Sequence, residues 1–524
     1  MTLREYLGGR FMNSEMISLI DIGSNTIRLV IFEIGEDYRL YELQNIKTPA
    51  RLSQYLNEDK VMSQDGIDVL VNVLDNFYDV SKRYKVSKLM PMATAAIRQA
   101  ANQADILKQV KKKVGIQIQI IPEEKEAFYG SYAVARTTQT KNSVTVDIGG
   151  GSTEITLFEN KKVINYHSFP FGVVTLKQLF FTDKDHNNDK AIEKMTQFVK
   201  EQFKSLKWLK KCQLPITAIG GSARSIANVH QRTVDYPLGG VHGYQMSAND
   251  LNDTLELFKS LTIPELQNLD GLSQDRADII IPANVVFKSL FEEVKAPVFI
   301  FSNKGLREGI IMDYINEKTD QTAFSTQNVA NQSIYRLGLA YHTQDHVADY
   351  RGFLVSALYE ELCKQNIFEK DGQIARLLQY GSYLYYMGEY IENSAGSQHT
   401  FYIISNSELD GVSHQDRVVI SLLASYKNKS LFNQYIKPFH HWFNVSYIDH
   451  IRHLGGVIKF ANALNDSHMS VIKKISLVKT KDGYDLQLFH NGPVIAERYR
   501  ASRQKKHLDR LLRKDLNLSF IELP

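Results

Sequence analysis

The sequence predicts an α/β protein with two similar lobes, followed by a helical domain and a small α+β cap. In the first ~320 residues, apolar segments that end in glycine alternate with helical periodicity. One strand–turn–strand pattern occurs twice in this region, and beyond a polar stretch the periodicity becomes almost entirely helical. We therefore predict lobes over 1–139 and 140–318, a helical domain over 326–465 and the cap over 466–524.

The length and composition agree with several ordinary globular domains. The chain has 524 residues, against roughly 100–150 for a typical domain. A 43% hydrophobic and 23% charged composition excludes disordered, collagen-like and disulfide-scaffold classes. Without a long apolar segment, a secretory signal pattern or paired cysteines, we expect a cytoplasmic protein with no membrane partner. We also expect residues 1–15 to be disordered, with Met12 or Met16 as alternative starts.

The repeated pattern consists of an apolar strand ending in aspartate, a Gly/Ser turn and a second apolar strand. The first copy is Leu19-Ile-Asp21-Ile-Gly-Ser-Asn-Thr26, and the second is Val144-Thr-Val-Asp147-Ile-Gly-Gly-Gly-Ser-Thr153. A repeat separated by a whole lobe indicates two similar α/β lobes that face one another.

Periodicity and turn residues predict the other elements in order. The residues after Glu317 are polar and without period, so 318–328 is expected to be a linker; 332–463 is expected to be helical. Before the linker we predict helices over 65–80, 97–110, 124–136, 223–230 and 306–315, and strands over 88–93, 114–121, 215–219 and 299–301. After the helical domain we predict strands over 471–478 and 484–488, then a basic helix.

The glycine turns can support phosphate chemistry. Backbone amides in a glycine turn approach phosphate oxygens closely, and Mg²⁺ prefers one or two carboxylates together with substrate phosphates. Any single turn of this kind is a weak signal, but four of them follow strands, and two are preceded by aspartate. The phosphate-binding candidates are Gly23, Ser24, Asn25, Thr26, Gly149, Gly150, Gly151, Ser152, Gly220, Gly221, Ser222, Ser302 and Lys304.

Rival nucleotide motifs are missing. The sequence has no G-x-x-x-x-G-K-[ST], and no G-x-G-x-x-G follows a first strand. Arg98, which follows the Ala93-Thr94-Ala95 turn, is a candidate phosphate clamp because its guanidinium presents a planar fork of donors. An exposed helical arginine is the plainer interpretation of this residue.

Five motifs in order resemble the exopolyphosphatase / guanosine pentaphosphate phosphohydrolase (Ppx/GppA) family. They are Asp21-Ile-Gly-Ser-Asn-Thr, Ala93-Thr-Ala-Ala-Ile-Arg98, Asp147-Ile-Gly-Gly-Gly-Ser-Thr-Glu154, Gly220-Gly-Ser222 and Gly305-Leu-Arg-Glu308-Gly. The resemblance covers residues 16–318 and implies two actin-like lobes of the ribonuclease H-like ATPase superfamily with the active site in the cleft between them. The region after the linker resembles the HD-like domain of the family's long members, which are often homodimers.

The resemblance also assigns roles. It implies that Glu126 is the catalytic base, whereas the residues alone leave Glu123 and Glu124 as equal candidates, since acids are favoured at a helix start. It implies Mg²⁺ at Asp21, Asp147 and Glu154, with a monovalent cation as a further candidate.

The sequence departs from the family pattern at two places. The turn before Leu306 is Ser302-Asn-Lys-Gly305, so Lys304 is either a substrate contact or a solvent-exposed side chain. In the helical domain, Tyr385-Tyr386 occupies the expected His-Asp step and Asn462 replaces an acid. We therefore expect this domain to bind no metal.

The net charge of +4 is unevenly distributed. Residues 451–524 carry 14 basic and 7 acidic side chains, and eight of the basic ones fall between Arg498 and Lys514. A basic block on an otherwise slightly acidic protein suggests an anionic partner, although a solvated helix face is an equal alternative. The candidates for a polyphosphate track are Arg498, Arg503, Lys505 and Lys506.

Together these observations favour an exopolyphosphatase that uses Mg²⁺ and a Glu-activated water to remove terminal phosphate from inorganic polyphosphate. A guanosine pentaphosphate phosphohydrolase is the first alternative, because the same motifs serve both. A non-catalytic polyphosphate or alarmone sensor is the second, and a sugar kinase is less favoured. No nucleic-acid partner is expected.

Overall fold

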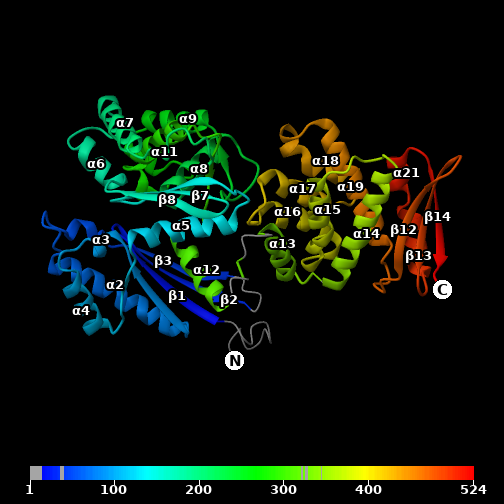
Figure 1. The fold of residues 1–524 in the computed structure, drawn as a ribbon, viewed down its shortest axis with the longest axis horizontal. Coiled ribbons are helices and arrows are strands. Elements are labelled where there is room, and N and C mark those ends of the chain that lie inside the picture. The colour runs from blue at the N-terminus through cyan, green and yellow to red at the C-terminus, as the bar shows by residue number, and fades with distance from the viewer. Residues whose placement is uncertain (1–14, 36–39, 320–322, 325–328, 344) are drawn as a thin grey trace. The chain divides into compact units, whose positions relative to one another are not determined.

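The computed structural model describes residues 15–35, 40–319, 323–324, 329–343 and 345–524 (Figure 1). The chain forms two compact units, one of residues 1–236 with 241–329 and one of 237–240 with 330–524. This division is coarser than the four predicted domains, whose boundaries stay predictions. The disorder expected for residues 1–15 lies outside the described residues, except that Glu15 begins the first strand.

The N-terminal unit contains two sheets that share a five-strand topology, to which the second sheet adds one edge strand. In the first sheet the order is β3-β2-β1-β4-β5, with β1 antiparallel to β2 and parallel to β4. Its strands are β1 (Glu15–Ile22), β2 (Thr26–Ile34), β3 (Leu40–Pro49), β4 (Lys88–Ala93) and β5 (Gln119–Ile120). On one face, apolar residues of β1 and β2 pack with α2 (Gln64–Arg83), α3 (Ala95–Arg98) and α4 (Gln103–Val114).

The second sheet repeats this arrangement, with the order β10-β11-β9-β6-β7-β8. Here β6 is antiparallel to β7 and parallel to β9, as β1 is to β2 and β4, so the internal repeat is confirmed. Its strands are β6 (Ser143–Ile148), β7 (Thr153–Glu159), β8 (Lys162–Phe169), β9 (Ile216–Ile219), β10 (Gln245–Met246) and β11 (Phe299–Phe301). Its helices are α6 (Val173–Phe181), α7 (Asp189–Lys204), α8 (Gly220–Thr233), α9 (Ala248–Ser260), α10 (Ile263–Gln267) and α11 (Ile280–Val294), with a 3₁₀ turn η2 (Gln274–Arg276).

Two helices, α5 (Glu123–Thr137) and α12 (Leu306–Lys318), pack closely against each other between the sheets (Figure 1). Glycine makes this approach possible, because a Cβ at Gly309 would lie 2.0 Å from the backbone oxygen of Tyr129. Apolar residues of α5 and α12 join those on the free face of β1 and β2 in a second cluster. α5, which carries Glu126 in its first turn, also contacts β7 and β8 of the second sheet.

Several predicted elements of the N-terminal unit are wrong in extent. The strand expected over 114–121 shortens to β5, because α4 runs to Val114 and Gly115 turns the chain with a φ of +82°. The alternating Ile116 and Ile118 are buried in the core without strand pairing. The helix expected over 97–110 is two helices, α3 and α4. The linker expected over 318–328 is partly docked, since Lys318 ends α12 and Phe324 is buried with its amide bonded to Asn316.

The C-terminal unit is helical with a small sheet at its end, as expected. Its main helices are α13 (Val329–Ala340), α14 (Asp345–Lys364), α15 (Gly372–Tyr383), α16 (Gly396–Asn406), α17 (His414–Ala424), α18 (Lys429–Ile436) and α19 (Val445–Ala463). The cap consists of β12 (Ile472–Lys479), β13 (Gly483–His490), α20 (Ile495–Gln504), α21 (Lys506–Leu512) and β14 (Asp515–Glu522). β14, which pairs in parallel with β13 after the two-helix crossover, was not predicted from the sequence. In the part of the chain that the structure describes, none of the helices has an apolar stretch that could span a membrane.

Candidate active site

A polar cavity of about 240 Å³ lies between the two lobes of the N-terminal unit. It collects residues from both copies of the sequence repeat and from α5, α8 and α12, segments far apart in the chain. Of the predicted residues it is lined by Asp21, Gly23, Ser24, Asn25, Thr26, Glu126, Asp147, Gly149, Gly150, Gly151, Ser152, Glu154, Gly220 and Gly221.

Five carboxylates line this cavity: Glu308, whose Oε2 accepts a hydrogen bond from the Gly305 amide, and the four described next. Asp21 and Asp147 occupy equivalent places near the ends of β1 and β6, and Glu154 lies directly across from Asp147 in the β6–β7 pair. Glu126 joins them from the first turn of α5. Side-chain geometry around Asp147 is tight, because a Cβ at Gly220 would lie 2.6 Å from its Oδ1.

These carboxylates raise one another's pKa. Burial and the Asp21 carboxylate raise the pKa of Asp147 to about 6, although Arg307 and Arg276 oppose the shift. Burial and the Glu126 carboxylate raise the pKa of Glu154 to about 8. Burial also raises the pKa of Asp21. A group of acids that resist ionising together is typical of a site completed by a cation.

The residue types present suit Mg²⁺. Asp21, Asp147 and Glu154 line the cavity with carboxylate oxygens, the hard ligands by which Mg²⁺ is usually held together with substrate phosphates. A divalent cation among them would favour their ionised forms and so reverse the upward pKa shifts.

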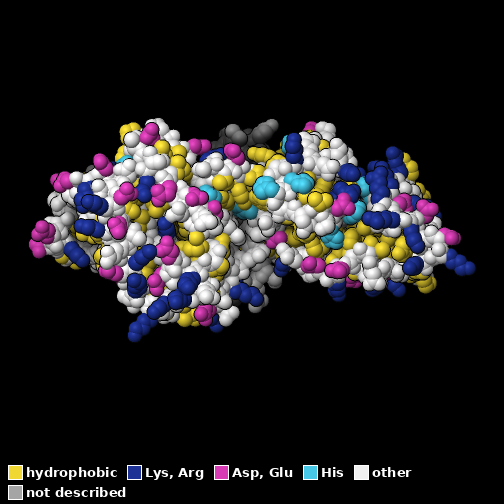
Figure 2. All heavy atoms as spheres, turned by 90° about the horizontal axis from the view of Figure 1, so that it is seen from above, with side chains coloured by type: hydrophobic (Ala, Val, Ile, Leu, Met, Phe, Trp, Pro, Cys, Tyr) yellow, Lys and Arg dark blue, Asp and Glu magenta, His cyan; other side chains and the backbone are white. Residues whose placement is uncertain are grey.

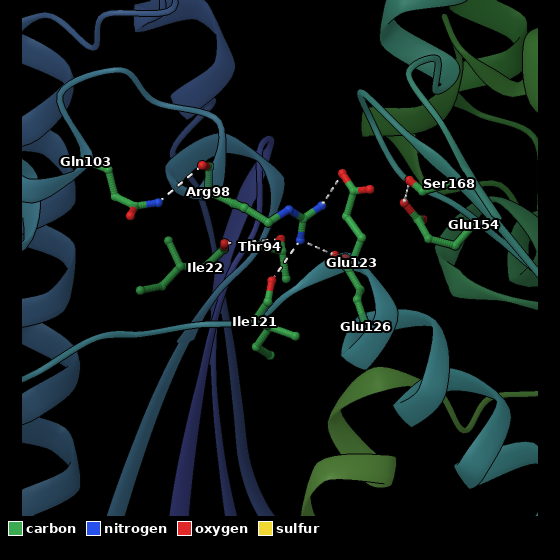
Figure 3. A network of polar contacts seen from close by, with 9 residues as sticks. All are labelled: Ile22, Thr94, Arg98, Gln103, Ile121, Glu123, Glu126, Glu154 and Ser168. Carbon is green, nitrogen blue, oxygen red and sulfur yellow. Dashed lines mark hydrogen bonds and ion pairs between the residues drawn. The ribbon is translucent and has the colours of Figure 1, made fainter. Parts of the chain in front are cut away.

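Glu126 is held by Arg98 (Figure 3). Its Oε2 accepts a hydrogen bond of 2.7 Å from Arg98 Nη1, and the same nitrogen donates to the backbone oxygen of Ile121 at 2.9 Å. Arg98 Nη2 lies 3.3 Å from the carboxylate of Glu123, the first residue of α5. Burial, with smaller contributions from Asp147 and Asp21, raises the pKa of Glu126 to about 7 despite the Arg98 hydrogen bond. A carboxylate with a pKa near neutrality is suited to take a proton from water.

The glycine turns of the two lobes have the same backbone structure. Gly23 N donates to Thr26 O at 3.0 Å, and Gly149 N donates to Ser152 O at 2.9 Å. The second turn is anchored on α6, where the amide of Val174 donates to Gly150 O at 2.9 Å. Within the described residues, the amides of Ser24, Asn25, Gly150 and Gly151 donate to no backbone carbonyl. They therefore remain available to phosphate oxygens in the cavity.

Four arginines that were not predicted as site residues line the same cavity: Arg28, Arg224, Arg276 and Arg307. Burial and the charges of Arg307 and Arg224 lower the pKa of Arg28, as burial and Arg224 do for Arg276. Crowded guanidinium groups with depressed pKa values indicate an anionic ligand, because an anion relieves their repulsion.

Two of these arginines carried a usable sequence signal. Arg28 stands opposite Asp21 across the β1–β2 hairpin, at the position that Glu154 holds in the second repeat. Arg307 lies inside the Gly305-Leu-Arg-Glu308 motif, with its Nε 3.9 Å from Asp21. Arg276 comes from the irregular segment around η2, where no pattern pointed to it.

Four predicted site residues lie outside the cavity lining. Arg98 does not line the cavity and instead donates to Glu126, so its role as a phosphate clamp stays a prediction. Ser222 is buried in the first turn of α8, where its Oγ accepts a hydrogen bond of 3.1 Å from Arg276. Ser302 is buried and bonds to the backbone of Lys304, while Asn303 and Gly305 line the cavity in their place. The expected turn at Gly220–Ser222 is in fact the start of α8, whose N-terminus lines the cavity.

In the helical domain, a buried arginine stands beside the position where an acid was expected. Arg351 donates from Nη1 to Asn462 Oδ1 at 3.1 Å and from Nε to Ser382 O at 2.9 Å, and its guanidinium lies 5.4 Å from the Tyr385 ring centroid. Burial lowers the pKa of Arg351 to about 10. The positive charge in contact with Asn462 is therefore the guanidinium of Arg351, a side chain of the domain itself.

The predicted track residues lie on α20, on α21 and at Lys505 between them, in the cap, where Figure 2 shows Lys and Arg side chains gathered. The four side chains differ in whether they are already bonded within the cap or exposed. Lys505 Nζ donates to the backbone oxygen of Leu516 at 2.6 Å, whereas Lys506 is exposed. Arg498 and Arg503 line a shallow groove with the exposed Ile495 and Tyr499. The track stays a prediction.

Known proteins resemble the chain over most of its length. It is 23% identical over 326 residues to exopolyphosphatase 1 of Mycobacterium bovis, covering 62% of this chain and 94% of that protein. It is 26% identical over 436 residues to the guanosine-5′-triphosphate,3′-diphosphate pyrophosphatase of Pseudoalteromonas translucida, covering 80% and 82%. It spans about half, 48%, of the bifunctional 3-dehydroquinate synthase/phosphatase of Fusobacterium nucleatum, at 25% identity over 59% of this chain.

A solved structure and two sequence-family models agree with these relatives. The crystal structure of the Aquifex aeolicus Ppx/GppA family member has a TM-score of 0.52 at 27% identity, covering 58% of this chain and 99% of that one. The Ppx/GppA phosphatase family model matches residues 30–318, and the model for domain III of these phosphatases matches 329–505. The chain therefore belongs to the Ppx/GppA phosphatase family, in its long form.

Proposed function

We propose that this chain is an exopolyphosphatase that removes orthophosphate from the end of inorganic polyphosphate. One observation carries the proposal: a single polar cavity combines five carboxylates, four arginines and two glycine turns with uncommitted amides. Acids for a cation, donors for phosphate oxygens and a proton acceptor are the components that phosphoryl transfer to water requires. Similarity to exopolyphosphatase 1 supports the same chemistry.

In the proposed reaction, water attacks the terminal phosphorus in line with the bridging oxygen. Glu126 orients the water and accepts one of its protons, and Arg98 holds the Glu126 carboxylate in place. The bond between the terminal phosphorus and the bridging oxygen breaks, releasing orthophosphate and a chain one unit shorter. The arginines and turn amides stabilise charge on the equatorial oxygens throughout.

Asp21, Asp147 and Glu154 would hold Mg²⁺, which when bound supplies Lewis-acid neutralisation of phosphate charge. Neighbouring residues fix the positions of these carboxylates. Ser168 Oγ donates to Glu154 Oε1 at 3.1 Å and so fixes its orientation (Figure 3). Gly220, with a φ of +91°, leaves the space that the Asp147 carboxylate occupies.

Hydrolysis of guanosine pentaphosphate is the second candidate function. It is favoured by the similarity to the Pseudoalteromonas pyrophosphatase, which extends over 80% of this chain. The phosphate chemistry is the same in both reactions, and the substrates differ only beyond the phosphates.

Phosphate release from long-chain polyphosphate and from guanosine pentaphosphate, measured side by side, tests the proposal. Glu126→Gln should lower kcat by about 10²–10⁴-fold, because it keeps the shape of the side chain but cannot accept a proton. A wild type that cleaves only the nucleotide contradicts the first proposal. Tight binding of both without turnover would instead identify a sensor.

A further inference from the structure

An ion pair joins the two lobes of the N-terminal unit beside the phosphate cavity (the polar cavity of about 240 Å³). Lys47 Nζ, on β3 of the first sheet, donates to Asp275 Oδ2, on η2 of the second lobe, at 2.5 Å. Neither residue lines the phosphate cavity, but Arg276, the next residue along the chain, does. The ion pair therefore acts on the backbone that carries one of the cavity arginines.

Apolar packing does little to fix η2 against the first lobe. None of the three residues of η2 is buried, and a cavity of about 380 Å³ opens beside Asp275. This cavity lies between Arg51, Ser53 and Gln54 of the first lobe and a face of α6 in the second. Burial by itself would raise the pKa of Asp275, but the hydrogen bond and the charge of Lys47 lower it. The ion pair is thus a direct polar link from η2 to the first lobe.

The second lobe anchors the same segment from the other side. Arg276 Nη1 donates to Ser222 Oγ at 3.1 Å. Two residues further on, Asp278 Oδ2 accepts a hydrogen bond of 2.6 Å from Lys177 Nζ on α6. These contacts relate Arg276 to the second lobe, whereas the Lys47–Asp275 pair relates it to the first.

The strand that carries Lys47 also supports a cavity arginine of the first lobe. Arg28 on β2 donates from Nη1 to Oδ1 of Asn45 on β3 at 3.0 Å, and Lys47 stands opposite Arg28 in the β2–β3 register. Side chains of β3 thus contact Arg28 itself and the residue that precedes Arg276. One edge strand relates the positions of two arginines, from different lobes, that line the same cavity.

We infer that Lys47 and Asp275 are positioning residues: their ion pair holds η2 against β3 and so keeps Arg276 directed at phosphate groups in the phosphate cavity. The inference rests on the proposed function only in that this cavity must hold phosphate groups. It gives β3 a part in phosphate binding, although Lys47 does not line the cavity.

The opposite charges of the pair separate positioning from general electrostatics. Lys47→Met removes a positive charge near a site for anions and Asp275→Asn removes a negative one, so electrostatics alone would weaken phosphate binding in the first variant and strengthen it in the second. Positioning predicts that both variants bind tripolyphosphate about three- to tenfold more weakly, the scale of coupling between neighbouring residues. Calorimetry on the full chain measures this binding. Lys47→Arg keeps the ion pair and should bind as the wild type does.

The Lys200–Glu292 pair supplies the matched control. Its N–O distance is 2.7 Å, and its side chains are 40% and 45% exposed, against 30% and 44% for Lys47 and Asp275. Both of its residues belong to the second lobe and line neither cavity, so Lys200→Met should leave tripolyphosphate binding unchanged. In an Arg276→Met background, Lys47→Met should have no further effect, because its effect passes through Arg276.

Hydrogen exchange gives a readout that needs no ligand. The amides of Arg276 and Ala277 are hydrogen-bonded within their own segment, and their exchange should become faster in both variants of the ion pair but not in the control. Stronger tripolyphosphate binding by Asp275→Asn, unchanged exchange in η2, or an undiminished effect of Lys47→Met in the Arg276→Met background would overturn the inference. Since binding and exchange are measured, a wild type without turnover would refute the proposed function and leave this test intact.

Discussion

Replacing Gly220 with alanine tests how closely the cavity depends on one backbone position. The added Cβ would lie 2.6 Å from Asp147 Oδ1, whereas ordinary contact begins near 3.4 Å. The carboxylate must therefore move by roughly 0.8 Å, and a misplacement of about 1 Å at a reacting centre can cost about 10²-fold in rate. The φ of +91° adds a backbone strain of about 1–3 kcal/mol.

Gly115→Ala is the matched control. Gly115 has a φ of +82°, yet a Cβ there would meet nothing within 4 Å. Both variants should lose stability in thermal unfolding because of the backbone strain, and Gly220→Ala should lose more because its Cβ also meets Asp147. In an orthophosphate-release assay at saturating Mg²⁺, only Gly220→Ala should lose about 10²-fold in kcat. Wild-type kcat in Gly220→Ala, or an equal loss in Gly115→Ala, would refute the reasoning.

Two further predictions concern Arg98 and His507. Arg98→Met should lower kcat by about tenfold or more with little change in KM, because Arg98 contacts Glu126 and does not line the cavity; a rise in KM alone would show that it binds substrate. Burial, together with Lys459, Lys506 and Arg510, lowers the pKa of His507 to about 4. Since the unfolded chain takes up this proton near pH 6.5 and the folded chain does not, the C-terminal unit should keep full stability above pH 6.5 and lose up to about 3 kcal/mol as the pH falls towards 4. Urea unfolding at pH 7.5 and 5.0 measures this loss, which His507→Gln should reduce; an unchanged pH dependence in that variant would contradict the assignment.

The sequence was most informative where local pattern and tertiary position coincide. Asp21 and Asp147 end strands in a visible repeat, and the β1–β2 and β6–β7 hairpins form as the apolar alternation indicates. β14 was missed because it follows a basic helix, and its pairing with β13 bridges the α20–α21 crossover. Such long-range pairing leaves little local signal.

The site was predicted less completely than the fold. The acidic residues stood out because strands and motifs marked them, but Arg276 reaches the cavity from an irregular segment whose course depends on tertiary packing. A Cβ on Gly221 would lie 2.1 Å from Arg276 Nη2, so this glycine makes room for a guanidinium from another segment. The pairing of Arg98 with Glu126 was not predicted, since it depends on where α5 lies relative to α3.

The most direct test of the central claim is the rate of orthophosphate release from long-chain polyphosphate with Mg²⁺, for wild type and Glu126→Gln. The proposed function predicts turnover by the wild type and a loss of at least 10²-fold in kcat for the variant, with KM nearly unchanged. Equal turnover by the two proteins would contradict the role of Glu126. No release by the wild type from polyphosphate would contradict the exopolyphosphatase activity itself.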